Sequence, residues 1–224
     1  MSHRQVSVNG YESKEEWSTV QHVKSYLNIA NDIPHRREGE GILLEYVPFN
    51  AKRILDLGTG DGRLVKLLKR DRPNMQAVAL DISPTMLKIS RDYFAEDEGV
   101  KLVEHDLSYP LPELGVFDAV VSSFAIHHLT HKRKRSLYTE VFDMLNPSGI
   151  FCNLEHVASP TPGIRERFLT AIGAKLTKFV KEDKSNKLLA METRLYWLRE
   201  IGFIDVDCYW KWLELALLVG IKSQ

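Results

Sequence analysis

Cysteine is scarce in this chain. The two cysteines, Cys152 and Cys208, are not spaced like the ligands of a metal site, and both lie in apolar runs that we predict to be buried strands. Free thiols inside a core are typical of proteins in a reducing compartment. The scarcity therefore argues against a disulfide-stabilised secreted protein, and we expect a cytoplasmic one.

Net charge and long apolar runs are also lacking. The 30 basic residues balance the 30 acidic residues, so the overall charge gives no footprint for nucleic acid or for an acidic membrane. A local basic run at 131–135 is expected to be the solvated start of a helix. The longest apolar segment, 213–221, is shorter than the about 20 residues that cross a bilayer, and the polar N-terminus has no signal-peptide core. We expect neither a membrane nor a nucleic acid as a partner.

What the chain does have is a regular alternation of strand-like and helix-like segments from residue 52 onward. Strand-like runs occupy residues 53–57, 76–82, 100–106, 117–124 and 149–157. Helical patterns occupy residues 62–70, 84–95, 132–145, 163–182 and 187–202. Two further strand-like runs, 203–210 and 212–220, are separated by one residue and predict a tight antiparallel hairpin. This order predicts an α/β fold, a doubly wound and mostly parallel sheet with helices on both faces.

The run "ILDLGTGDGRL" (54–64) places three glycines between a predicted strand and a predicted helix. Ligands of doubly wound sheets bind beyond the carboxyl ends of the strands, so this loop is the first candidate binding site. A phosphate loop of the Walker type needs Lys-Ser or Lys-Thr after the glycines, and neither follows here. A dinucleotide fingerprint needs G-x-G-x-x-G, whereas the spacing here is G-x-G-x-G. Asp56 and Asp61 would also repel a pyrophosphate.

An acidic glycine loop suits a ligand that is positively charged and carries no phosphate. S-adenosylmethionine has these properties, with an α-ammonium group, a sulfonium centre and a ribose with free hydroxyls. Asp56 or the loop carbonyls are predicted to receive the ammonium group. Gly58 and Gly60 let the backbone approach the ligand where a Cβ would collide with it.

Two later aspartates extend this interpretation. Asp81 ends the second predicted strand, where a carboxylate can accept both ribose hydroxyls, although it is also placed to cap the next helix. Asp106 follows the third strand and is predicted to accept the adenine amino group, with Leu107 and Ile82 on either side of the ring. A simple turn aspartate is the alternative role for Asp106.

The chain resembles the class I S-adenosylmethionine-dependent methyltransferases over roughly residues 45–220. The matching motifs are "ILDLGTGDG" (54–62), "ALDIS" (79–83), "EHDL" (104–107), "FDAVVSSFAIHHL" (117–129), "MLNPSGIFCNLEHV" (144–157) and "LREIGFIDVDCYW" (198–210). The resemblance implies a Rossmann-like sheet of seven strands in the order 3-2-1-4-5-7-6, with the last strand antiparallel. It implies one methyltransferase domain over 1–224, in which 1–50 form a helical lid and 51–224 the catalytic core. Residues 158–186 are expected to form a helical insertion over the pocket.

The resemblance also implies roles for single residues. Ser122 and Ser123 end the fourth strand and are expected near the sulfonium centre. Tyr26, in the N-terminal lid, is expected at the cofactor. Arg36 and Arg37 are either lid residues that reach the cofactor carboxylate or an acidic substrate, or surface residues.

Methyl transfer needs a general base only if the acceptor must lose a proton; otherwise alignment of the acceptor is the main requirement. His127 and His128 follow the fourth strand and are candidate bases, with His127 favoured by the resemblance, although the pair can also serve only to order the loop. Glu155 is a candidate base or amine ligand, and an ion pair with the lid, with Arg165 or with Arg167 is the alternative. The spacing of these residues matches no metal signature, so we expect no metal.

The favoured function is methyl transfer from S-adenosylmethionine to a small-molecule acceptor. Three alternatives stay open: a carboxy-S-adenosylmethionine synthase-like enzyme, a methyltransferase of tRNA or protein, and a cofactor-binding scaffold without activity. Fold and cofactor do not fix the acceptor. The sequence also leaves the oligomeric state open, a homodimer included.

Overall fold

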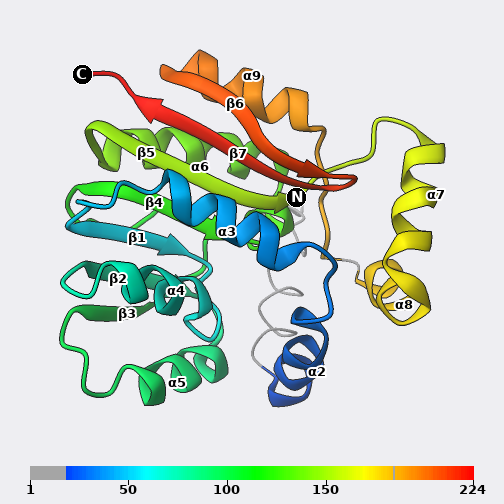
Figure 1. Cartoon of the computed structure of the whole chain (residues 1–224), viewed down its shortest axis with the longest axis horizontal. Helices are drawn as coiled ribbons and strands as arrows, with labels where there is room; N and C mark the ends of the chain where they lie inside the picture. The colour runs from blue at the N-terminus through cyan, green and yellow to red at the C-terminus, as the bar shows by residue number, and fades with distance from the viewer. Residues whose placement is uncertain (1–18, 184) are drawn as a thin grey trace, which may run out of the picture.

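The computed structural model describes residues 19–183 and 185–224. In this part of the chain the strands are β1 (Arg53–Leu57), β2 (Gln76–Asp81), β3 (Val100–Glu104), β4 (Phe117–Ser123), β5 (Leu145–His156), β6 (Phe203–Trp212) and β7 (Leu215–Lys222). They form one seven-stranded sheet in the order β3-β2-β1-β4-β5-β7-β6 (Figure 1), which confirms the predicted order. β7 is antiparallel to both neighbours, β5 and β6, and the other strand pairs are parallel.

Helices cover both faces of this sheet (Figure 1). They are α2 (Val20–Ala30), α3 (Arg36–Tyr46), α4 (Arg63–Asp71), α5 (Pro84–Tyr93), α6 (His131–Met144), α7 (Pro162–Ala171), α8 (Gly173–Glu182) and α9 (Met191–Ile201), with a short 3-10 helix, η2 (Ile126–His128). Leu43 of α3 and Ile54 of β1 belong to the core on one face, and Leu55 of β1 and Leu137 of α6 belong to the core on the other. Because neighbouring strand residues point to opposite faces, burial on both faces explains the continuous apolar runs of β1 and β4.

Several predicted boundaries were wrong for local reasons. The terminal hairpin turns through two residues, Leu213 and Glu214, and not one; Leu213 takes a positive φ of 49° there. The predicted helix 163–182 is two helices, because Gly173 has a φ of 77° and breaks the helical path after α7. The helix predicted from 187 starts at Met191. The backbone before it is held by the short helix η2, since the amide of Lys187 donates to the His127 carbonyl.

The parallel strands all end at the same edge of the sheet, and three helices lie beyond that edge. Figure 1 shows α2, α7 and α8 on the side toward which β1 points. The expected N-terminal lid is described only from residue 19, where α2 and α3 precede the sheet; residues 1–18 lie outside the described residues. None of the described helices is long and apolar enough to cross a membrane.

Candidate functional site

The glycine loop lies where β1 ends and α4 begins. Gly58 and Gly60 have positive φ angles of 74° and 57°, a region that glycine enters without the steric cost other residues incur. A Cβ on Gly58 would lie 2.1 Å from the Cβ of Ala125, so the loop packs directly against the segment after β4. The backbone amides of Gly58 and Thr59 also donate to the carbonyl of Leu80 in β2. These contacts fix the loop between the ends of neighbouring strands.

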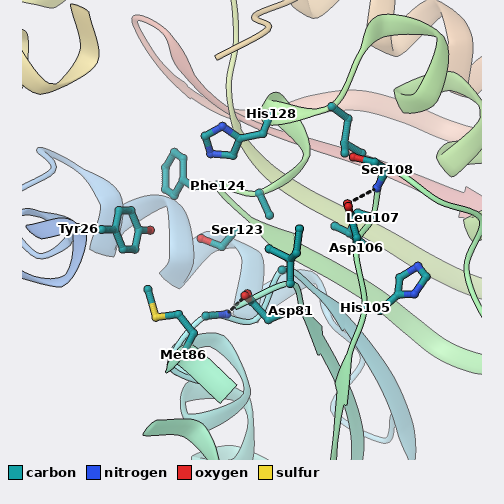
Figure 2. A pocket seen from close by; sticks show the side chains of 15 residues that line it. Tyr26, Asp81, Met86, His105, Asp106, Leu107, Ser108, Ser123, Phe124 and His128 are labelled. Atoms are coloured by element: carbon teal, nitrogen blue, oxygen red, sulfur yellow. Dashed lines mark hydrogen bonds between the residues drawn. The ribbon is translucent and has the colours of Figure 1, made fainter. Parts of the chain in front are cut away.

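Beside this loop is a hollow of about 740 Å³, which we call the loop cavity (Figure 2). The predicted cofactor residues that line it are Tyr26, Gly58, Gly60, Asp81, Ile82, Asp106, Leu107 and Ser123. Its remaining walls are formed by Met86, His105, Ser108, Phe124, Ala125, His128 and Leu129. Segments that are far apart in the sequence therefore meet around one hollow at the carboxyl ends of the strands.

Asp81 ends β2 and faces the loop cavity (Figure 2). Its Oδ2 accepts a hydrogen bond of 2.8 Å from the Gly60 amide, and its Oδ1 accepts one of 2.8 Å from the Ser83 amide. Ser83, and not Asp81, caps α5, because its hydroxyl accepts from the Met86 amide. Burial raises the pKa of Asp81 to about 6. The carboxylate is thus held at the cavity wall with lone pairs left for a ligand.

The segment after β3 forms another wall of the loop cavity. Asp106 Oδ1 accepts from the Ser108 amide at 2.8 Å, a local turn that orients the side chain (Figure 2). Leu107 is buried, and Leu107 and Ile82 give this wall apolar surface. The Nε2 atom of His105 is buried and has no hydrogen-bond partner among the described residues. Sequence reasoning did not single out His105, although it stands in the same motif as Asp106.

A second hollow of about 550 Å³, the polar cavity, adjoins the glycine loop on the side of α2 and α3. Asp56 lines it; its Oδ2 is buried without a partner in the described part of the chain, and burial raises its pKa to about 7. Arg36 also lines it, 2.8 Å from Glu40 and 5.3 Å above the ring of Phe124. Arg37 is exposed. The polar cavity therefore brings charged groups of both signs to this side of the loop: the carboxylates of Glu40, Asp56 and Asp61 and the guanidinium groups of Arg36 and Arg63.

The two serines that end β4 point in different directions. Ser123 lines the loop cavity and the polar cavity, and its Oγ is buried with no partner among the residues described. Ser122 is fully buried, and its hydroxyl donates to the carbonyl of Leu57 at 2.7 Å. Side chains alternate along a strand, so only one of two consecutive residues can face the cavity. We therefore assign the expected cofactor contact to Ser123 and withdraw it from Ser122.

A third hollow of about 650 Å³, the apolar chamber, is walled by α7 and α8 on its outer side. Tyr26, Phe124 and His128 line both this chamber and the loop cavity, so the two hollows adjoin at these side chains. The rest of its lining consists of Ile29, Ile33, His127, His156, Phe168, Ile172, Leu176, Val180, Asp183, Asn186 and Leu215. The helices expected to cover the pocket thus enclose a largely apolar space next to the loop cavity.

A buried carboxylate orients His127 in the wall of the apolar chamber. The Nδ1 of His127 lies 3.1 Å from Glu155 Oε1, and Arg194 donates to Glu155 Oε2 at 2.8 Å. Burial alone raises the pKa of Glu155, but His127 and Arg194 lower it to about 2. Glu155 does form an ion pair, but its partner is Arg194 of α9 and not Arg165 or Arg167 as the alternative predicted. Arg165 pairs with Glu214 instead. Glu155 is fully buried and lines none of the three hollows, so its carboxylate contacts His127 and Arg194 and not the space of the hollows.

Removal of Arg194 is expected to be strongly destabilising. In an Arg194→Met variant, Glu155 stays buried but loses its cation, which typically costs about 3–5 kcal/mol. We expect a fall of that size in the free energy of unfolding, measured by urea denaturation. Arg165→Met is the matched control, because the Arg165 side chain is 32% exposed and water can replace it. Equal losses in the two variants would contradict the special role of Arg194.

A second imidazole faces the same chamber in a similar arrangement. The Nε2 of His156 lies 2.8 Å from Glu214 Oε2, and Arg165 and Ser159 bind the same carboxylate. Burial lowers the pKa of His156 in spite of Glu214. The ring centroids of His156 and His127 are 5.9 Å apart. Within residues 19–183 and 185–224, these groups do not form a cluster of three or more side chains that could hold a metal ion.

His128 has surroundings different from those of His127. Its Nδ1 lies 2.7 Å from the hydroxyl of Ser185, and burial lowers its pKa well below the ordinary value. The ring therefore stays neutral near pH 7. The loop that carries both histidines is fixed by the buried Lys134, whose Nζ donates to the carbonyls of His127 and Leu129. His128 thus forms a neutral wall between the loop cavity and the apolar chamber.

Sequence reasoning missed the groups that act through other residues. Arg194 has no motif around it, and Glu214 is a single charge within the apolar run 213–221. A weak signal existed for Arg194, because it falls beside Leu195 and Leu198 on the buried side of α9. A charged residue in such a position needs a buried partner.

The family model for a methyltransferase domain matches residues 54–149. A demethylmenaquinone methyltransferase of Clavibacter sepedonicus is 30% identical over 172 residues, which cover 71% of this chain and 69% of that protein. A demethylmenaquinone methyltransferase of Thermus thermophilus is 36% identical over 137 residues, which cover 60% of this chain and 59% of that protein. The chain therefore spans less than two thirds of the length of the Thermus relative.

A solved structure shares the fold of this chain. It is a 1,6-didemethyltoxoflavin-N1-methyltransferase of Burkholderia thailandensis with bound 1,6-didemethyltoxoflavin and S-adenosylhomocysteine. The match covers 100% of this chain and 94% of that one, with a TM-score of 0.67 and 15% identity. An identity this low shows the common fold alone.

Proposed function

This chain belongs to the class I S-adenosylmethionine-dependent methyltransferases, and we propose that it transfers a methyl group to a hydroxyl of a small-molecule acceptor. One observation carries the proposal: the loop cavity adjoins the apolar chamber at Tyr26, Phe124 and His128. A hollow with the features of a cofactor site is thereby joined to a second hollow with His127 in its wall. The chain spans only part of the length of its relatives, so the chemical class of the acceptor is inferred from the lining of the chamber and not from theirs.

The residues present fit S-adenosylmethionine. Three polar atoms of the cavity walls, Asp56 Oδ2, His105 Nε2 and Ser123 Oγ, are buried without partners among the described residues. Buried polar groups normally have a partner, and the polar groups of the cofactor would supply it. Asp56 matches the charge of the α-ammonium group, and Arg36 matches that of the α-carboxylate.

The loop cavity suits the nucleoside end of the same molecule. Asp81 would accept hydrogen bonds from the ribose hydroxyls, as carboxylates at this place in doubly wound sheets do. Asp106 would accept the adenine amino group. Ile82 and Leu107 supply apolar surface for the two sides of the ring.

When bound, S-adenosylmethionine supplies a methyl group on a sulfonium centre, ready for displacement by a nucleophile. His127 accepts the proton of the acceptor hydroxyl at Nε2, because its Nδ1 is committed to Glu155. Glu155 stabilises the charge that forms on the imidazole, and Arg194 keeps Glu155 ionised. A positioned base of this kind contributes about 10²–10⁴-fold to the rate. The apolar walls keep water out and hold the acceptor in line.

The affinity for the cofactor is expected to depend on pH. The pKa values of Asp56 and Asp81, about 7 and about 6, mean that both carboxyls are protonated at low pH in the free protein. Ionised Asp56 attracts the ammonium group, and ionised Asp81 accepts hydrogen bonds from the ribose hydroxyls more strongly than a neutral carboxyl does. S-adenosylhomocysteine should therefore bind more tightly as pH rises from about 5 to about 8. Between pH 6 and pH 7, where only Asp56 is still protonated, we expect a change of about tenfold per pH unit, and below pH 6, where Asp81 is protonated as well, a steeper one.

Calorimetry in two buffers of different ionisation heat measures this effect, and binding near pH 6.5 should release protons. Asp56→Asn is the control variant. In it, the increase in affinity should level off near pH 6, where Asp81 titrates. An affinity that is the same at pH 5 and pH 8 in the unaltered protein would rule out both assignments.

Two assays test the proposed function as a whole. The first is calorimetry with S-adenosylmethionine, where absence of binding at hundreds of micromolar ligand refutes the cofactor. The second is transfer of tritiated methyl groups to a cell extract that is then separated into small molecules and macromolecules. We expect the label among the small molecules; label in RNA or protein contradicts the proposed acceptor. The mass of any co-purified nucleoside distinguishes ordinary S-adenosylmethionine from a carboxylated form.

We further propose a cytoplasmic location, and an action that needs neither a membrane nor a nucleic acid. The 30 basic residues are balanced by 30 acidic residues, which argues against an extended basic surface for binding nucleic acid. The two cysteines, both unpaired, support a reducing compartment. A homodimer is compatible with these properties.

A further inference from the structure

Two polar groups of the apolar chamber have no role in the proposed reaction. His156 lines the chamber, and because its Nε2 is bound to Glu214, Nδ1 is the nitrogen left over. Asn186 also lines the chamber, and its Oδ1 is buried with no hydrogen-bond partner among the described residues. Buried polar atoms without partners are costly, and a bound ligand is one way in which the cost is removed. The chamber therefore suits an occupant with matching polar groups.

The protonation state of His156 determines whether the occupant must supply a hydrogen-bond donor or an acceptor. Burial raises the pKa of Glu214, but His156 and Ser159 lower it below its ordinary value, and burial lowers the pKa of His156. The pair is thus a neutral imidazole that donates from Nε2–H to an ionised carboxylate. Its Nδ1 is then an acceptor with a free lone pair. Asn186 Oδ1 is also an acceptor, so both groups call for a donor such as a hydroxyl and not for a carbonyl oxygen.

The remaining walls define the body of the occupant. Tyr26, Phe124 and Phe168 give the chamber three aromatic side chains, and aliphatic residues fill most of the rest. Such walls suit a flat aromatic ring. Among the described lining residues there is no lysine or arginine to pair with an anion. The one carboxylate, Asp183, accepts from the amide and the hydroxyl of Ser185.

We propose that the acceptor is an uncharged aromatic compound with two hydroxyl groups, of which one meets His127 and the other is recognised by His156. The proposal rests on the proposed function and adds its substrate class and a residue that determines specificity. The two imidazole centroids are 5.9 Å apart, so both hydroxyls fit on one ring or on two fused rings. His127 removes the proton from the hydroxyl that is methylated. The hydroxyl at His156 donates to Nδ1 and keeps its proton.

The test compares ring compounds that differ by one hydroxyl. 1-Naphthol and a set of naphthalenediols are titrated into the protein saturated with S-adenosylhomocysteine, and their dissociation constants are measured. We expect at least one diol to bind about tenfold more tightly than 1-naphthol, the value of one net hydrogen bond. His156→Gln places an amide nitrogen at the Nε2 position, so it keeps the bond to Glu214 and loses Nδ1. In this variant the diol preference should disappear while the 1-naphthol affinity is unchanged.

His156→Asn is the matched control, because its amide replaces Nδ1 and retains part of the preference. Three results would overturn the proposal: no diol preference in the unaltered protein, an unchanged preference in His156→Gln, or no binding of any of these compounds. Calorimetry with S-adenosylhomocysteine on the same samples separates the two levels of inference. Intact cofactor binding with no diol preference refutes the substrate class alone, whereas absent cofactor binding refutes the proposed function as well.

Discussion

His127→Asn is expected to lower the rate of methyl transfer about 10³-fold and to leave the affinity for S-adenosylhomocysteine unchanged. The reason lies in the two ring nitrogens. Nδ1 of His127 is 3.1 Å from Glu155, and the asparagine amide can keep that bond. Nε2, the atom that takes the acceptor proton, has no counterpart in asparagine. The variant should therefore fold normally and bind the cofactor, but lack the base.

The measurement is the initial rate with tritiated S-adenosylmethionine and an acceptor at saturation, together with calorimetry of the variant. His128→Asn is the matched control. Its Nδ1 contacts Ser185 and its ring lines both hollows, so we expect a loss of about tenfold or less, the scale of one hydrogen bond. A fully active His127→Asn variant would mean that the acceptor needs no base or that another group removes the proton.

Asp81→Asn is expected to weaken S-adenosylhomocysteine binding by about 100-fold. Hydrogen bonds to a charged group contribute about 1.5–3 kcal/mol each, and Asp81 is placed to accept from two ribose hydroxyls. Asparagine has one acceptor oxygen in place of two, so it cannot hold the glycine loop and both hydroxyls together. Calorimetry measures the loss, and urea denaturation checks that the variant is folded.

Asp106→Asn is the control for this result. Asp106 is half-buried, and its Oδ1 already accepts from the Ser108 amide in a local turn. In the proposed binding mode it meets only one end of the adenine ring, so we expect a loss of about tenfold or less. If Asp81→Asn and Asp106→Asn weaken binding equally, or if Asp81→Asn has no effect, Asp81 is not the ribose ligand.

Local sequence patterns were sufficient for the sheet and for the loop cavity. The apolar runs located the strands and the glycine spacing located Gly58 and Gly60, because these depend on residues close together in the chain. The order of the strands was implied by the resemblance to the class I methyltransferases. Asp81 and Asp106 followed for the same reason, since each ends or directly follows a strand. Parallel strands bring all such positions to one edge of the sheet.

Patterns along the chain were insufficient where a role depends on side-chain direction or on a distant partner. Ser122 and Ser123 were both assigned to the cofactor, although the alternation of a strand allows only one of them to face it. Glu155 was placed in the site, yet its partner Arg194 is 39 residues away and holds it behind His127. No sequence window contains both residues of that pair.

The apolar chamber was also beyond sequence reasoning. Its walls come from α2, α7, α8 and the ends of β4, β5 and β7, which meet only in three dimensions. The break at Gly173 turns α8 relative to α7, and a continuous helix over 163–182 would have had a different face toward the sheet. The protonation state of His156, and with it a binding role, could be inferred only from its hydrogen bond with Glu214, which is 58 residues away in the sequence.

A crystal structure with S-adenosylhomocysteine tests the central claim most directly, namely the division of the site at Tyr26, Phe124 and His128. We predict the nucleoside in the loop cavity with its ribose hydroxyls on Asp81, and the amino-acid end in the polar cavity beside Asp56. The sulfur atom should face the apolar chamber. A ligand bound inside that chamber, or a ribose that does not touch Asp81, would contradict the account.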